Sequence, residues 1–433
     1  MKRTTLYSLR AVMAAVVMIF LGIGDVFSAS VVNIAQSPAL PIKNMQFGFN
    51  VGFLQQVNFE GEALRQISSD GFRRVRFYYP WTAKRKDQVN DVIADIDLLV
   101  GLGFDPMFTI SGMPKDLPTN EVKKRQWMAR LPKQKQQIIS KRESFFNASP
   151  PENIDQYRGF LDQFIAALEK KYGSEKLKKW VFEIGNEPDA PLFFWGDIAD
   201  FRNIFDATLS AIKTHDTRYY TGGSGFTSRL IAGQEGRSDY YGFARETGNR
   251  KDVDFVSFHA YDNRFEGFGS IENSVLNFCK DLKNDKIISE WNVDSEKKAA
   301  QFINSPEFME HLINIVYISY KGDVKQLYAH KLMDNPKREE EQLGLFDEHG
   351  QPKLAYKYYL MMRRAIENGF IAYEQDGAVI VRNSENVFVA ARKGDVQVDM
   401  TGYSVVEGSV PAAGNVLNLA AGNWVAARKK QTR

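Results

Sequence analysis

Two glutamates stand at the ends of apolar segments whose composition predicts β-strands. Glu187 follows the segment 179–186, and Glu290 follows the segment 286–289. A single carboxylate at such a place is as often a solvated strand end, although apolar strands do not favour carboxylates there. Two carboxylates facing each other across a pocket suit cleavage of a glycosidic bond, in which one protonates the leaving oxygen and the other attacks the anomeric carbon. The pair therefore indicates this class of chemistry.

An alternation of strands and helices must position these two glutamates. Between about residues 45 and 368, short apolar segments alternate with segments of helical periodicity, the pattern that builds a parallel sheet. Eight strands over this length favour a closed α/β fold, the (β/α)8 TIM barrel, over an open doubly wound sheet, and barrel chemistry lies where the strands end. The expected strands are residues 45–53, 72–79, 104–112, 179–186, 218–225, 253–260, 286–292 and 324–332.

The chain divides into three expected parts. Residues 1–30 predict a signal peptide, residues 31–368 the catalytic barrel, and residues 369–433 a small C-terminal antiparallel β module, β-sandwich-like, because its short alternating segments are broken by glycine and asparagine. Residues 31–44 are a candidate extra strand of that module. Structural support of the barrel is favoured over glycan binding as its role.

The signal peptide prediction rests on charge followed by apolar character. Lys2, Arg3 and Arg10 precede an apolar segment, residues 11–24, and small residues follow it at 28–30. We expect a periplasmic or secreted protein with no stable membrane insertion after cleavage, because the apolar segment is short for a bilayer. An uncleaved N-terminal anchor is the alternative.

Composition excludes several classes of protein. The 433 residues are 44% hydrophobic and 25% charged, typical of a globular chain, and 56 Lys and Arg against 53 Asp and Glu give no sign of a nucleic-acid partner. The single cysteine, Cys279, excludes an intrachain disulfide and lies in a helical pattern that favours burial. Five histidines without metal-ligand spacing predict no metal and no cofactor. We expect a monomer.

Four motifs carry a resemblance to a known family. FEIGNEPD (182–189), ISEWN (288–292) and SFHAY (257–261) resemble signatures of the clan A retaining glycoside hydrolases, and GLFDEHGQPKLAYKYY (344–359) resembles the closing motif of family 39 and its relatives. With a small β module added, the layout is most similar to the family 39-like endoglycosidases of bacterial exopolysaccharide pathways, the Psl glycosidase type. The resemblance covers about residues 45–368 and is specific at the two glutamates.

The resemblance implies roles for individual residues. Glu187 would be the general acid/base, Glu290 the nucleophile, and Asn186 the donor to the sugar 2-hydroxyl. Arg76 matches the arginine that steadies the nucleophile. A guanidinium beside Glu290 would keep it ionised, whereas a more apolar surround would leave Glu187 protonated.

Further matches and departures concern the sugar site. His259 and Tyr261 match a pair in which the tyrosine hydroxyl bonds the nucleophile. His330 and Lys331 stand where several clan families have tryptophan, and Ser111 lacks the histidine seen beside it in family 5. These departures argue against family 5.

Aromatic residues follow the same strands. Tyr78, Trp195 and Trp291 are predicted to present flat faces to sugar rings, with ordinary anchoring of loops as the alternative. Glu183, on the strand before Glu187, is expected to point inward and support the site by hydrogen bonds rather than to react.

A basic segment follows the third expected strand. Residues 115–142 contain nine Lys and Arg and two Asp and Glu. Long connections at this end of a barrel are usually functional, so this segment is a candidate holder of an acidic glycan. A solvated helical lid is the slightly preferred alternative.

Together these observations predict a retaining β-glycosidase that hydrolyses a bacterial exopolysaccharide by double displacement, with endo action. The alternatives are a catalytically silent glycan-binding accessory of polysaccharide synthesis or export, and a transglycosylase that uses the same residues. A polysaccharide is the only partner expected.

Overall fold

The computed structural model describes most of the chain. The described residues are 31–51, 57–78, 81–82, 85–143, 146–233, 238–262, 271–293, 297–334, 342–411 and 414–431. The predicted signal peptide, residues 1–30, lies outside them. Of the described helices, none is both long and apolar enough to cross a membrane.

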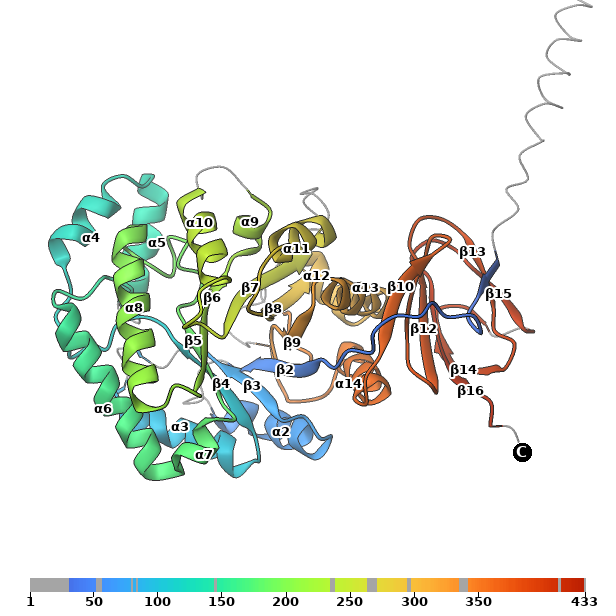
Figure 1. Ribbon diagram of the computed structural model, residues 1–433, viewed down its shortest axis with the longest axis horizontal. Helices are drawn as coiled ribbons and strands as arrows, with labels where there is room; N and C mark the ends of the chain where they lie inside the picture. The colour runs from blue at the N-terminus through green and yellow to red at the C-terminus, as the bar shows by residue number, and fades with distance from the viewer. Residues whose placement is uncertain are drawn as a thin grey trace, which may run out of the picture.

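Eight parallel strands close into a barrel, which confirms the predicted TIM barrel (Figure 1). The first strand pairs with the second and also with the eighth, so the sheet has no free edge. All eight strands lie within or close to the predicted segments. They are β2 Gln46–Val51, β3 Arg74–Phe77, β4 Asp105–Ile110, β5 Val181–Ile184, β6 Tyr220–Phe226, β7 Phe255–Asp262, β8 Asp285–Val293 and β9 Val324–Ala329.

Helices surround the barrel, and most of them bury an apolar face against it. The α6 helix shows why: its buried side chains recur every three or four residues, the Asn153 side chain caps its first turn, and Gly173 ends it at φ 79°. The helices are α2 Val57–Ser69, α3 Asn90–Gly101, α4 Glu121–Met128, α5 Lys133–Glu143, α6 Ile154–Tyr172, α7 Ser174–Leu177, α8 Ile198–His215, α9 Ser228–Ile231, α10 Ser238–Thr247, α11 Ile271–Cys279, α12 Lys297–Ile303, α13 Glu307–Lys321 and α14 Leu354–Ile366.

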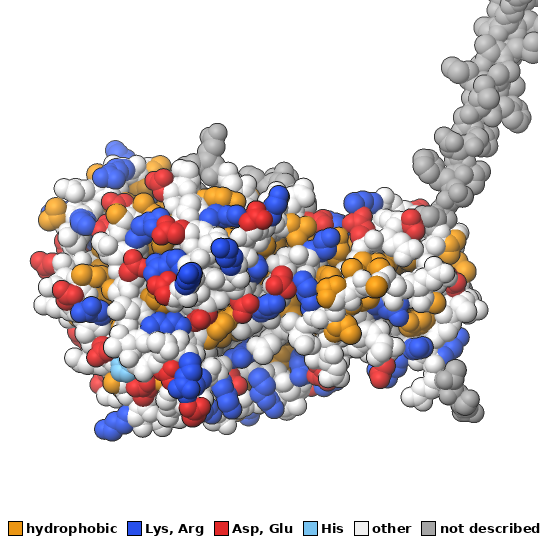
Figure 2. All heavy atoms as spheres, in the orientation of Figure 1, with side chains coloured by type: hydrophobic (Ala, Val, Ile, Leu, Met, Phe, Trp, Pro, Cys, Tyr) orange, Lys and Arg blue, Asp and Glu red, His pale blue; other side chains and the backbone are white. Residues whose placement is uncertain are grey.

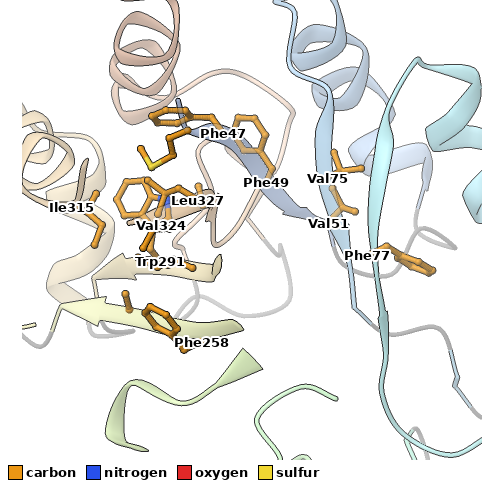
Figure 3. Close-up of a cluster of buried hydrophobic side chains, with 14 of the residues drawn as sticks. Phe47, Phe49, Val51, Val75, Phe77, Phe258, Trp291, Ile315, Val324 and Leu327 are labelled. Atoms are coloured by element: carbon orange, nitrogen blue, oxygen red, sulfur yellow. The ribbon is translucent and has the colours of Figure 1, made fainter. Parts of the chain in front are cut away.

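On β2 the pleat places apolar side chains on the outer face and a polar side chain on the inner face of the barrel. On β2, Phe47 and Phe49 pack outward against the Tyr359 ring of α14, at centroid distances of 5.0 and 5.2 Å (Figure 3). Asn50, the next residue, is buried on the other side and contacts the Arg76 side chain of β3. Polar side chains of successive strands therefore meet inside the barrel.

The C-terminal residues form two small sheets beside the barrel. A five-stranded sheet has the order β10-β11-β12-β16-β14, and a three-stranded sheet the order β1-β13-β15. The strands are β10 Ile371–Gln375, β11 Ala378–Arg382, β12 Asn386–Ala391, β13 Val396–Asp399, β14 Tyr403–Gly408, β15 Val416–Leu419 and β16 Trp424–Lys429, with β1 Val31–Asn33 from the start of the described chain. One apolar cluster fills the space between the sheets. We call β1 and β10–β16 the β module.

Two features of the β module differ from a simple C-terminal addition. β1 pairs in parallel with β13, so residues 31–33 belong to this module and not to the barrel; the other pairs are antiparallel. The module also shares a core with the barrel helices, because the Trp424 Nε1 donates to the Pro306 carbonyl at 2.7 Å and its ring packs against Tyr358 of α14. The two parts are therefore joined by a buried interface.

Candidate active site

A buried arginine is the centre of the polar cluster inside the barrel. Arg76, on β3, donates from Nη1 to the Asn50 and Glu290 side chains at 2.8 and 2.7 Å, from Nε to Glu183 at 2.6 Å, and from Nη2 to Asn186 at 2.6 Å. Burial lowers the pKa of Arg76, but the charges of Glu183 and Glu290 more than offset this and raise it. The guanidinium is therefore a permanent cation that fixes four residues on or directly after three other strands, β2, β5 and β8.

Glu290, at the carboxyl half of β8, is held as a carboxylate. Its Oε1 accepts from Arg76, and its Oε2 accepts from the Tyr261 hydroxyl at 2.6 Å. Burial raises the pKa of Glu290, but the charges of His259, His330 and Arg76 and the Tyr261 hydrogen bond lower it to about 2. Burial holds the pKa of His330 itself at about 4, so at neutral pH the pKa of Glu290 is lowered by His259, Arg76 and Tyr261 and not by His330.

Glu187 lies opposite, directly after β5, in a different environment. Its backbone has φ 47°, a conformation that side-chain-bearing residues seldom adopt, and its N–H donates to the Gly225 carbonyl at 3.0 Å. The Oε1 lies 2.8 Å from the His259 Nδ1, and the side chain is 18% exposed. No cation equivalent to Arg76 is bonded to this carboxyl among the described residues.

The Glu187–His259 pair retains a proton. Burial raises the pKa of Glu187, although the hydrogen bond and charge of His259 lower it in part. Burial lowers the pKa of His259, but the charges of Glu290 and Glu187 raise it above its usual value. The pair can therefore donate a proton at pH values where an isolated glutamate would have lost it.

The spacing of the carboxylates decides which displacement they can perform. One oxygen of Glu187 and one of Glu290 lie, with a His259 nitrogen, within 4.8 Å of one another. Inverting glycosidases need a water between their carboxyl groups and separate them by about 6.5–9.5 Å, whereas retaining enzymes place them about 5–5.5 Å apart. This spacing matches the retaining arrangement, in which one carboxylate attacks directly, and is shorter than the inverting one.

The buried residues below the two glutamates form a continuous network of hydrogen bonds. Glu183 is fully buried and accepts at 2.6 Å from Arg76, from the Thr109 hydroxyl and from the Ser257 hydroxyl. Gly225 lies against the cluster, since a Cβ there would approach the Arg76 Nη2 to 3.2 Å. Glu183 therefore occupies the buried position expected from its place on the strand.

Several residues of this cluster were not predicted from the sequence. Asn50 donates to the Ser289 carbonyl and accepts from Arg76, and Thr109 and Ser257 bond Glu183. The only sign of these residues in the sequence is that each is a polar residue within an otherwise apolar strand.

Tyr78 and His330 border the site on the side of β3 and β9. The Arg76 guanidinium lies 5.4 Å from the Tyr78 ring centroid, and the rings of Tyr78 and His330 are 6.1 Å apart. The His330 Nδ1 is 3.5 Å from the Glu290 Oε2. Tyr78 thus lies beside the carboxylates, where a ligand would meet it.

The other two predicted stacking residues lie elsewhere. Trp291 is 1% exposed and points outward, because it follows the inward-facing Glu290 on the same strand; it packs against Phe308 of α13 at 5.8 Å (Figure 3). Trp195 has no exposed surface and belongs to an apolar cluster with Ile139 and Phe146. The structure therefore contradicts a sugar-stacking role for both tryptophans and shows them as packing residues.

The same cluster offers ligand atoms for a cation, although the sequence predicts no metal. Glu187, His259 and Glu290 satisfy the distances for three ligands. Each of them already has a hydrogen-bond partner, and the Arg76 guanidinium bonded to Glu290 would repel a cation. The donor set fits proton transfer better than metal binding.

A pocket opens next to this cluster, between the ends of β4 and β5 and the helices α6 and α8. It encloses about 390 Å³ of empty space, part of it open to solvent, and Asn186 lies in its wall together with Met113 and Phe193. Neither Glu187 nor Glu290 lines it. The pocket adjoins the reaction centre without containing it.

Comparison with known proteins adds family and fold information. The family described as Glycosyl hydrolases family 39 matches residues 89–287, a little under half of the chain, a range that contains Glu187 but not Glu290. A β-xylosidase of Geobacillus stearothermophilus is 25% identical over 171 residues, which are 39% of this chain and 29% of that relative. A β-xylosidase of Caldicellulosiruptor saccharolyticus is 24% identical over 183 residues, 42% and 33% of the two chains. The matches thus span a third or less of the relatives' length.

Solved structures resemble the chain over nearly its whole length. A monomeric β-xylosidase from Caulobacter crescentus superposes with a TM-score of 0.65 at 15% identity and covers 92% of this chain and 98% of its own. A GH39 enzyme from Xanthomonas axonopodis pv. citri gives a TM-score of 0.64 at 12% identity, with 94% and 99% covered. At such low identity these likenesses show the fold alone.

Proposed function

We propose that this chain is a retaining β-glycosidase that hydrolyses a polysaccharide, with Glu187 as general acid/base and Glu290 as nucleophile. The observation that carries the proposal is the pair itself: two carboxylates within 4.8 Å of each other, one held ionised with its pKa lowered to about 2 and the other with its pKa raised. Opposite protonation states at this spacing are what double displacement requires.

In the first step, a Glu290 oxygen attacks the anomeric carbon and forms a covalent glycosyl ester. The bond from that carbon to the leaving oxygen breaks, and this oxygen takes the proton of the Glu187–His259 pair. In the second step, Glu187 removes a proton from a water whose oxygen attacks the same carbon, and Glu290 leaves as a carboxylate. Two inversions retain the β configuration. The hydrogen bond from Arg76 to the Asn186 Oδ1 supports Asn186 as the donor to the sugar 2-hydroxyl.

The finer assignment is also a proposal. The predicted signal peptide supports export to the periplasm or medium, and the resemblance of the sequence motifs supports an exopolysaccharide substrate cut internally. The curated relatives are named β-xylosidases, so aryl β-xylosides and β-glucosides are the first substrates to assay.

The test is the stereochemical outcome followed by proton NMR with an aryl β-glycoside. The expected first product is the β-hemiacetal, which then mutarotates. An α product would contradict the retaining assignment. Turnover that is absent in wild type for aryl glycosides and polysaccharides alike would favour the silent glycan-binding alternative, and products longer than the substrate would favour a transglycosylase.

A further inference from the structure

The basic segment predicted from the sequence folds into a helical hairpin at the carboxyl end of the barrel. It joins β4 to α6 and contains α4 and α5, which lie together at one edge of the molecule (Figure 1). We call residues 115–143 the basic hairpin. Because it leaves the barrel where β4 ends, it lies on the same side as Glu187 and Glu290.

The basic hairpin contains many more cationic than anionic side chains. Eight of its described side chains are cationic and three are anionic, whereas the whole chain has an excess of only three cations. Figure 2 shows Lys and Arg side chains at the edge where α4 and α5 lie, interspersed with hydrophobic and acidic side chains. Within the described part of the chain, Arg130, Lys133 and Lys135 are exposed and form no ion pair. Their charge is available to a ligand.

The inner side of the hairpin is fixed to the rim of the active site. Ile139 of α5 forms a buried cluster with Phe146 and Trp195, and Tyr78 packs against that cluster. The Tyr78 ring lies 5.4 Å from the Arg76 guanidinium, which is bonded to Glu290. The hairpin is therefore connected to the nucleophile through the buried cluster, Tyr78 and Arg76. We describe it as a wall at the rim of the active site.

Two further contacts hold this wall to the rest of the barrel domain. Lys123 forms an ion pair with Asp200 in the first turn of α8, and the Lys124 ammonium lies 5.5 Å from the Trp195 ring centroid. These two cations already interact with residues of the neighbouring segment, although the Lys123 side chain is 51% exposed. Some cations of the hairpin thus hold it in place, and others remain exposed. This arrangement suits a fixed surface that binds a polyanion.

We propose that the basic hairpin is an extended binding surface for an anionic polysaccharide, whose acidic sugar units lie along α5 while a neighbouring linkage reaches Glu187 and Glu290. This inference rests on the proposed glycosidase function and adds its substrate class. Continuity with Tyr78 and the active site favours a glycan over an anionic membrane, although Val122 and Ile138 are 56% and 46% exposed.

The test measures binding without turnover, so that it can fail separately from the proposed function. Full-length Glu290→Gln protein is titrated with alginate, a polyuronate, and with neutral glucomannan, at low and high salt. Lys133→Glu/Lys135→Glu is compared with Lys170→Glu/Lys179→Glu, a control with the same change of charge at the amino end of the barrel, where both lysines are exposed. Glutamates in the first turn of α5 suit the helix dipole, so the variant should fold.

We expect the hairpin variant to bind alginate about tenfold or more weakly at low salt and the control less than about twofold. When the hairpin substitutions are made in protein that retains Glu290, turnover of a small neutral aryl glycoside should not change. Equal losses in both double variants, equal affinity for glucomannan and alginate, or binding only to vesicles of anionic phospholipid would each overturn the proposal.

Discussion

The interior of the barrel and the interior of the β module differ in the polarity of the side chains that fill them. The module core, which includes Ile380, Val389 and Leu419, is apolar, and none of the described residues 369–431 is both buried and polar or charged. The barrel interior contains Arg76, Glu183 and other buried polar side chains. Buried charges are costly even when paired. The module therefore has an apolar core, whereas the barrel interior keeps buried charged side chains that are unfavourable for stability but serve the proposed reaction.

Glu290→Gln is the substitution with the largest expected effect. The amide keeps the shape of the site but cannot form the glycosyl ester, so kcat should fall on the order of 10⁴-fold or more. Thermal unfolding should stay close to that of wild type. Glu385→Gln, at an exposed site of the β module, is the matched control and should leave both unchanged.

The pH profile sharpens the comparison of the two carboxylates. Activity needs Glu290 ionised, which holds above its pKa of about 2, and the Glu187 pair protonated, which holds below the raised pKa of Glu187. The bell of kcat/KM against pH should therefore have its basic limb above the ordinary range of a glutamate. Glu187→Gln should lower kcat/KM about 10²–10⁴-fold for poor leaving groups and remove the basic limb. An unchanged basic limb would assign the acid elsewhere.

Arg76→Met tests whether the polar interior depends on its cation. Removing the guanidinium leaves Glu183 and Glu290 buried without their partner, which should cost about 3–5 kcal/mol in the free energy of unfolding measured with urea. Residual activity should shift to higher pH, because Glu290 loses the cation that lowers its pKa. A stability equal to wild type would show that the network is not held by Arg76.

Ile380→Val in the β module has the smallest expected effect. The lost methylene in a fully buried position should cost about 0.5–1.5 kcal/mol of stability. Because the module contributes none of the residues of the active site, kcat/KM should stay the same. A loss of activity at full folding would show that the module acts on the active site.

The sequence predicted the eight strands and the inward-facing glutamates because apolar periodicity and strand-end carboxylates are local signals. The stacking role predicted for the two tryptophans is wrong, because a residue close in sequence to a site glutamate can still point away from the site. Trp291 follows an inward-facing residue, so the pleat turns it outward, and Trp195 is buried by a hairpin whose fold no local pattern gives. Asn50 and Ser257 depend on contacts with distant strands, which sequence spacing does not reveal.

Azide rescue tests the assignment of the two glutamates most directly. Glu187→Ala opens the side of the leaving group, so azide should attack the glycosyl ester on Glu290 and give a β-glycosyl azide from an aryl β-glycoside that wild type hydrolyses. Glu290→Ala opens the opposite side, so azide should displace the leaving group directly and give the α-glycosyl azide. The account predicts these two opposite anomers by NMR; the same anomer from both variants would contradict it.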